Sequence, residues 1–497
     1  MSFSSSSGVS RRRFVQGLAV GGVATAFGWP RFGLAAPAPV LTGTDFDLVI
    51  DELPVNFTGR SRIGVAVNGS VPAPTLRWRE GTTVELRVSN RLSPKSFHSR
   101  QTSIHWHGIL LPANMDGVPG MSFDGIGPGE TYRYRFDLRQ SGTYWYHSHS
   151  GYQEQAGLYG ALIVDAAEPE PFDYQRDHVV LLSDWTDLAP ADLYARLKKM
   201  PGHDNYGKRT VGDFLRDAKR DGLGATVEDR KMWGEMRMTP TDLSDVNAHT
   251  YTYLINGTTS LGNWTGLFSH GEKVRLRFIN GSAMTHFDVR IPGLAMTVVA
   301  VDGQNVHPVT IEEFRIAAAE TFDVIVTPNG ADAFTIFAQD LGRTGCVSGT
   351  LAVREGLRAP VPAVDPRPIL SMADMGHGGM DHGSMDHSGH DMTSMESMPM
   401  KGMEGGCGAN MHGSKQHGAQ GDGMQKHPAS ETRNPLVDMQ TMMPTPKLDD
   451  PGIGLRGNGR KTLRYSMLRS LFDDPDGRDP GREVELHLTG HMERFAW

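Results

Sequence analysis

The chain has 497 residues, which is long enough for several domains. Its formal net charge of −8 and its pI near 6.2 argue against nucleic acid as a partner, because phosphate binding needs clustered Lys and Arg. Only two cysteines occur, Cys346 and Cys407, so no framework of disulfides is expected to hold the fold.

Residues 1–36 have the pattern of an export signal. Three arginines at positions 11–13 precede a short, glycine-rich apolar run at 17–27, and small residues follow up to Ala36. This order is typical of a secretory signal, and the adjacent arginines resemble a bacterial twin-arginine signal. A chance arginine run before a membrane anchor is the alternative, but the apolar run is short for a span. We expect export to the periplasm by the twin-arginine pathway, with no stable membrane span.

The remaining chain repeats one all-β unit. Residues 81–90 return as residues 271–280, and both copies read G-x-x-V-x-L-R-x-x-N with the alternation of apolar and polar residues that strands have. Glu130 returns as Glu320 at the same offset of 190 positions. A constant offset predicts two sandwiches of short strands, at 37–167 and 168–365.

Two further segments complete the organisation. Residues 191–200 and 210–221 carry apolar residues at spacings of three and four, which predicts surface helices or an ordered linker without chemistry. A third copy of the motif, G-x-x-V-x-L, begins at Gly481, so residues 431–497 are expected to open a third sandwich. The alternative is a tail strand added to the second sandwich.

Two His-x-His motifs in the first copy are the sharpest features of the sequence. They are formed by His105 and His107, and by His147 and His149. Residues i and i+2 of a strand point to the same side, so each pair offers two imidazoles on one face. Imidazole binds copper, zinc, iron and nickel, so the motifs predict a metal site.

The second copy provides an internal control. An offset of 190 positions maps His147 and His149 onto Phe337 and Gln339, and the counterpart of the first pair falls near 291–297, where no histidine occurs. The second copy therefore keeps the scaffold without these histidines, which favours a metal site over a packing role.

H-W-H-G followed by H-S-H in a repeated sandwich resembles the multicopper oxidases. The twin-arginine start, residues 182–187 and the H-L-T-G at 487–490 resemble one subgroup, the copper-resistance protein A family of periplasmic oxidases. The resemblance covers nearly the whole chain. It implies tandem cupredoxin-like Greek-key sandwiches, two complete and a third only begun. It also implies oxidation of Cu(I), with phenols as a further substrate class, coupled to reduction of oxygen to water.

The same resemblance assigns copper to the paired histidines. His105 would ligate the type 2 copper, and His107, His147 and His149 would ligate the type 3 pair. The family's remaining motifs, H-x-x-H-x-H and H-C-H-x-x-x-H-x-x-x-x-M, do not occur in this sequence, so the type 1 ligands are absent from it. The repeat spacing places these motifs past Trp497, which predicts a truncated or frame-interrupted member that does not turn over as written.

Asp116 is the candidate catalytic residue. Similar oxidases place an acid soon after H-x-H-G to pass protons to the reduced oxygen, and a carboxylate near the metals can act as a general acid. An ordinary Asp-Gly turn residue is an equally weighted alternative.

The tract from Met372 to His427, inside a predicted Met/His-rich copper-binding segment at 366–430, holds eleven of the chain's 25 methionines and seven histidines. Its Gly, Ser and charge prevent it from forming a core. Thioether favours Cu(I) and imidazole accepts either copper state, so we interpret the tract as a flexible copper-collecting arm. An inert linker is the alternative.

Three functions follow, in order of preference. The first is a periplasmic copper-dependent oxidase whose partners are copper ions and molecular oxygen, with other periplasmic copper-handling proteins as candidates and no nucleic acid. The second is a non-enzymatic copper-sequestering protein, ranked lower because an unfinished third sandwich leaves unpaired strand edges. The third, zinc or iron at the paired histidines, lacks the carboxylate-rich shell that non-haem iron prefers.

Overall fold

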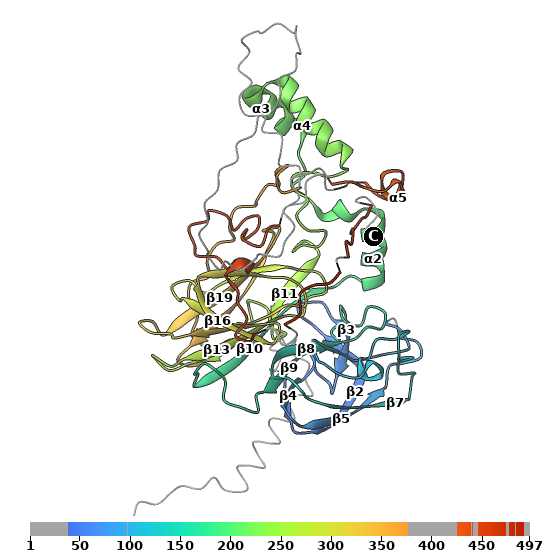
Figure 1. Cartoon of the computed structure of the whole chain (residues 1–497), viewed down its shortest axis with the longest axis vertical. Coiled ribbons are helices and arrows are strands. Elements are labelled where there is room, and N and C mark those ends of the chain that lie inside the picture. The colour runs from blue at the N-terminus through green and yellow to red at the C-terminus, as the bar shows by residue number, and fades with distance from the viewer. Residues whose placement is uncertain are drawn as a thin grey trace, which may run out of the picture.

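The computed structural model describes residues 38–96, 98–375, 425–438, 440, 446–473, 477–482 and 484–491. The predicted export signal and nearly all of the Met/His tract lie outside these residues. Figure 1 shows two neighbouring β-sandwiches, with a helical extension that projects from the second. Among the described residues, none of the helices combines the length and the apolar character that crossing a bilayer requires.

The first sandwich packs a five-stranded sheet, ordered β1-β4-β9-β8-β6, against a four-stranded sheet, ordered β3-β2-β5-β7. A 3-10 turn, η1 (Ala113–Met115), follows β6. The strands are β1 (Val40–Thr42), β2 (Asp45–Val55), β3 (Arg62–Val67), β4 (Thr75–Arg79), β5 (Thr83–Asn90), β6 (His105–His107), β7 (Thr131–Asp137), β8 (Gly142–His147) and β9 (Tyr159–Asp165).

The second sandwich packs a six-stranded sheet, ordered β11-β10-β13-β18-β15-β16, against a five-stranded sheet, ordered β12-β20-β19-β14-β17. Its strands are β10 (Arg176–Thr186), β11 (Tyr251–Ile255), β12 (Thr265–Leu267), β13 (Val274–Asn280), β14 (Phe287–Arg290), β15 (Met296–Val301), β16 (Gln304–Ile311), β17 (Glu313–Ile316), β18 (Thr321–Val326), β19 (Ala333–Asp340) and β20 (Cys346–Ala352).

The two copies of the sequence repeat have the same arrangement of neighbouring strands. Strand β5 lies between β2, a parallel partner, and β7, an antiparallel partner. Strand β13 lies between β10 and β18 in the same way. In β5 the apolar residues Val84, Leu86 and Val88 are fully buried, as strand alternation requires. The predicted all-β fold with strands at 81–90 and 271–280 is confirmed.

The predicted helices are also confirmed, and they lie between β10 and β11. They are α2 (Pro190–Lys199), α3 (Val211–Asp221) and α4 (Leu223–Glu235), with a 3-10 turn, η2 (Pro201–Asp204). Helix α3 begins at Thr210, whose hydroxyl accepts from the Asp213 amide while the Asp213 carboxylate accepts from the Thr210 amide. This capping box satisfies two donors and places the helix start where the sequence pattern begins.

The segment 446–473 lies against the second sandwich, through bridges between Val306 and Ser470 and between Glu313 and Thr462. It contains η3 (Tyr465–Met467), and α5 (Ala429–Thr432) precedes it. None of the residues that the structure describes within 477–490 is in a strand. The third sandwich therefore stays a prediction.

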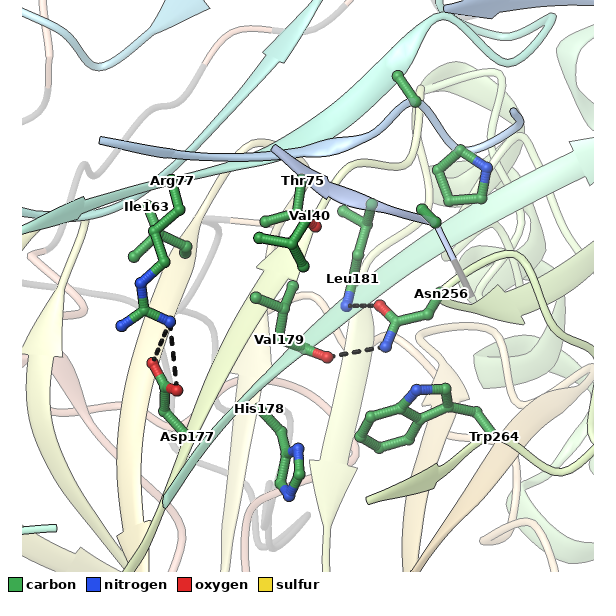
Figure 2. Close-up of a pocket in the computed structure, with 13 residues that line it drawn as sticks. Val40, Thr75, Arg77, Ile163, Asp177, His178, Val179, Leu181, Asn256 and Trp264 are labelled. Carbon is green, nitrogen blue, oxygen red and sulfur yellow. Dashed lines mark hydrogen bonds and ion pairs between the residues drawn. The ribbon is translucent and has the colours of Figure 1, made fainter. Parts of the chain in front are cut away.

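A cavity of about 230 Å³ lies between the two sandwiches (Figure 2). On one side of it Arg77 of β4 pairs with Asp177 of β10, at 3.2 Å between Nη1 and Oδ2. On the other side Asn256 donates to the Val179 carbonyl and accepts from the Leu181 amide, at 2.7 and 2.8 Å. The Arg77–Asp177 pair joins the sandwiches, because each residue belongs to a different one.

Candidate metal centre

Strand register brings the two His-x-His motifs together. Strands β6 and β8 are antiparallel neighbours, and His105 lies directly opposite His147. Between the two histidines of β6, Trp106 points the other way and is fully buried, 5.5 Å from Trp78 between ring centroids. The strand period therefore places one residue in the core and two imidazoles on the opposite face.

The rings of His107, His147 and His149 all lie close to the ring of His105. The ring of His105 is 5.5 Å from that of His107, 5.4 Å from that of His147 and 5.0 Å from that of His149. One ligand nitrogen of each of His105, His147 and His149 lies within 4.8 Å of the other two. The Nδ1 of His107 is 3.4 Å from the Nε2 of His147. The structure thus gathers the predicted residues into one cluster.

The loop after β6 holds His105. Its Nδ1 lies 2.8 Å from the Asp116 carbonyl oxygen and 3.3 Å from the Asp116 Oδ1. The loop approaches β6 closely at Gly117, where φ is +76° and a Cβ atom would lie 1.8 Å from the Ile104 carbonyl oxygen. Only glycine fits there, so Gly117 allows the Asp116 carbonyl to reach the ring. With Nδ1 turned to this carbonyl, His105 offers Nε2 to the cluster.

A carboxylate holds His147. The Oε2 of Glu154 lies 2.9 Å from the Nδ1 of His147, and the Ser148 carbonyl oxygen lies 3.3 Å from the same nitrogen. His147 is 5% exposed, and the Trp145 ring is stacked on it at 4.1 Å. Because Nδ1 faces an acceptor, its proton stays there and Nε2 faces the other imidazoles.

His149 lies just past the end of β8, so the expectation that both histidines of the second pair lie on a strand was wrong for this residue. Its ring still lies 4.9 Å from that of His147. The backbone amide of His149 donates to Ser103 Oγ at 3.0 Å, and Ser103 contacts Ser150. His149 is therefore held by buried serine hydroxyls and not by hydrogen bonds between β-strands.

The cluster disfavours protonated imidazole. Burial lowers the pKa of His105 and of His149, and the charge of neighbouring His147 lowers both further. Burial lowers the pKa of His107 to about 4, with the three other histidines adding to the effect. His105, His107 and His149 therefore favour the neutral form, which is the form that ligates metal.

These residues fit a bound transition metal. Imidazole nitrogens converge on one face, and the two best-held rings, those of His105 and His147, have Nδ1 turned to oxygen acceptors and Nε2 left for a ligand. Metal-ligating histidines usually carry such an acceptor on the second nitrogen. An all-imidazole set suits copper or zinc more than magnesium or calcium, which prefer oxygen. A cavity of about 290 Å³, lined by His107, Trp145 and Glu320, lies beside the cluster.

Register in the second sandwich corrects one expectation. Arg290 of β14 lies opposite Phe337 of β19, in the place that His105 and His147 have in the first sandwich. The counterpart of His105 is thus Arg290, one residue before the predicted range of 291–297. Its guanidinium lies 4.6 Å from the Phe337 ring centroid and pairs with Glu313 and Asp365. An ionic cluster occupies the equivalent place.

Glu154 is the residue near the cluster that the sequence did not single out. It lies seven residues after His147, in a turn-rich loop with no periodic pattern. The sequence offers one sign of its role, because Glu154 is a lone acidic residue in the loop that follows the second His-x-His motif. That sign is weak when the fold is unknown.

Comparisons with known proteins place the chain among related sequences. Two family models, each described as multicopper oxidase, match residues 50–169 and 176–355. Copper resistance protein A of Escherichia coli is 60% identical over 507 residues, covering 98% of this chain and 83% of that protein. Copper resistance protein A of Pseudomonas syringae pv. tomato is 60% identical over 513 residues, with the same two coverages. A mutant of the laccase from B. aclada has a similar structure, with a TM-score of 0.50 and 26% identity over 69% of this chain and 59% of the laccase.

Proposed function

The chain belongs to the copper resistance protein A family of multicopper oxidases, and on that premise we propose that its clustered histidines hold copper for the reduction of oxygen to water. The observation that carries this proposal is the convergence of imidazoles from β6, from β8 and from the residue pair just past β8: His105, His147 and His149 place ligand nitrogens within 4.8 Å of one another, and His107 lies beside them. His105 is assigned to a type 2 copper, and His107, His147 and His149 to a type 3 pair.

We propose Cu(I) as the substrate. Oxidation of four Cu(I) ions to Cu(II) supplies the four electrons that, with four protons, convert one O₂ to two waters. Bound copper supplies the one-electron chemistry of this reaction. The chain's own residues position the ligands and deliver protons.

Asp116 is the proposed proton donor. Its carboxylate lies 3.3 Å from His105 at the edge of the cluster, and the side chain is 40% exposed, so it exchanges protons with water. The His105 ring is also held by the backbone carbonyl of Asp116, which does not depend on the carboxylate. Proton delivery and ligand positioning are thus separable at this residue.

Two further assignments concern residues that lie wholly or mostly outside the described part of the chain. We propose that residues 1–36 direct twin-arginine export to the periplasm and that residues 372–427 collect copper. Deletion of the tract is expected to lower the number of Cu(I) ions bound per chain, and an unchanged number would contradict this role.

Oxygen uptake with Cu(I) as substrate tests the oxidase proposal. The protein to use carries this chain followed by the family's H-x-x-H-x-H and H-C-H motifs. We expect one O₂ consumed per four Cu(I), loss of uptake in His147→Ala, and no change in His270→Ala, a matched variant at an exposed histidine of the second sandwich. Uptake at the unmodified rate in His147→Ala would contradict the proposal. Copper binding without uptake in the unmodified protein would favour the sequestering alternative.

A further inference from the structure

A second histidine–carboxylate cluster lies outside the first sandwich. His427, Glu431 and His487 each place one ligand atom within 4.8 Å of the others. Their side chains are 10%, 16% and 24% exposed. We propose that this cluster binds one divalent transition-metal ion, Zn²⁺ or Cu²⁺, and thereby joins residues 425–432 to residues 484–491. The proposal does not depend on the oxidase function.

Glu431 lies at the centre of the cluster. Its Oε2 is 2.9 Å from the Nδ1 of His427, and its Oε1 is 2.7 Å from the Nδ1 of His487. The two imidazole centroids are 5.4 Å apart. A tetrahedral ion with bonds of about 2.0–2.1 Å separates its ligands by roughly 3.3 Å. The two nitrogen–oxygen distances differ from this ligand spacing by about half an ångström.

The ligand atoms that the cluster offers determine which class of ion it can bind. Two imidazole nitrogens and a carboxylate oxygen suit Zn²⁺ and Cu²⁺, whereas Cu(I) prefers thioether and thiolate sulfur. The Nε2 of His487 lies 2.6 Å from the Oε1 of Glu485, and Gln425 donates to the same carboxylate oxygen. A carboxylate on the second ring nitrogen is the usual support of a histidine that ligates a metal through the first.

An ion bound in the cluster would link two segments that are far apart in the sequence. His427 is the last histidine of the Met/His tract, and His487 directly follows the G-x-x-V-x-L motif near the end of the chain. The backbone amide of Asp438, six residues past the first segment, donates to the Gly490 carbonyl at 3.2 Å, so the chain that follows the first segment also meets residues 484–491. An ion bound by residues of both segments would hold the end of the tract against residues 484–491.

Equilibrium dialysis of the complete, metal-free chain against Zn²⁺ tests the site. Zn²⁺ is the probe because thioethers bind it poorly, so the methionines of the tract do not contribute. We expect Glu431→Gln and His487→Ala each to bind one zinc fewer than the unmodified chain. The matched control is His270→Ala, since His270 also pairs with a carboxylate, Asp332, at 3.0 Å, and it should keep the full number.

Two outcomes would overturn the proposal. Both cluster variants could keep the full number of zinc ions, or His270→Ala could lose as many as they do. Glu431→Gln keeps the shape of the side chain, so circular dichroism of this variant should match that of the unmodified chain. Zinc protection of the 432–484 region from limited proteolysis, present in the unmodified chain and lost in Glu431→Gln, is the second expected result, and protection that persists in the variant would contradict the joining role.

Discussion

Glu154 offers a direct test of how the cluster is positioned. Its carboxylate lies 2.9 Å from the Nδ1 of His147, whose side chain is nearly buried, and Glu154 itself is 27% exposed. Loss of such a partner typically costs 10–100-fold in metal affinity, which corresponds to about 1.4–2.7 kcal/mol. Glu154→Gln keeps an oxygen acceptor and should fall at the lower end of this range. Glu154→Ala keeps none and should fall at the upper end.

The Ser148 carbonyl sets a limit on this loss. It lies 3.3 Å from the same nitrogen and remains as an acceptor in both variants, so copper binding should weaken without disappearing. The assay is a Cu²⁺ titration of the full chain against a chelator of known affinity. Glu85→Gln is the matched control, because Glu85 pairs with Arg133 on the other sheet. Unchanged affinity in Glu154→Ala, alongside a clear loss in His147→Ala, would refute the positioning role.

Three other predictions follow from the described contacts. Asp116→Asn should slow oxygen reduction at normal copper content, because the backbone carbonyl still holds His105; an unchanged rate would remove the proton-donor role. Burial holds the pKa of His107 near 4, below its unfolded value of about 6.5, so stability of the metal-free protein should be greatest above pH 6.5 and fall toward pH 4. Thermal melts of His107→Asn should show a weaker dependence over that range, and an equal dependence would contradict the assignment. Thr143→Val should lower the free energy of unfolding by about 1–3 kcal/mol in denaturant titration, because buried Asp323 and Arg277 each lose a partner across the sandwich interface, whereas an unshifted midpoint would contradict this.

The repeated strands follow from local sequence pattern. Apolar and polar residues alternate in 81–90 and 271–280 with the period of a strand, and the repeat offset indicates that both segments have the same place in the fold. His105 and His107 share a face for the same reason. These features were predicted because each depends on residues one or two positions apart.

Other features depend on tertiary contacts that no local pattern encodes. The offset of 190 positions holds for β5 and β7 but not for β6, because the loops around β6 and β14 differ in length, so Arg290, the counterpart of His105, falls one residue before the predicted range of 291–297. Glu154 reaches His147 because a turn-rich loop folds back on β8. The partner of His487 is Glu431, 56 residues earlier, and no spacing rule links them.

The measurement that tests the central claim most directly is an anomalous difference map at the copper edge, from crystals of the full chain soaked in Cu²⁺. The account predicts a peak at about 2.0 Å, an ordinary metal–nitrogen bond length, from the nitrogens of His105, His147 or His149. Copper peaks elsewhere in the molecule with none at these histidines would contradict it.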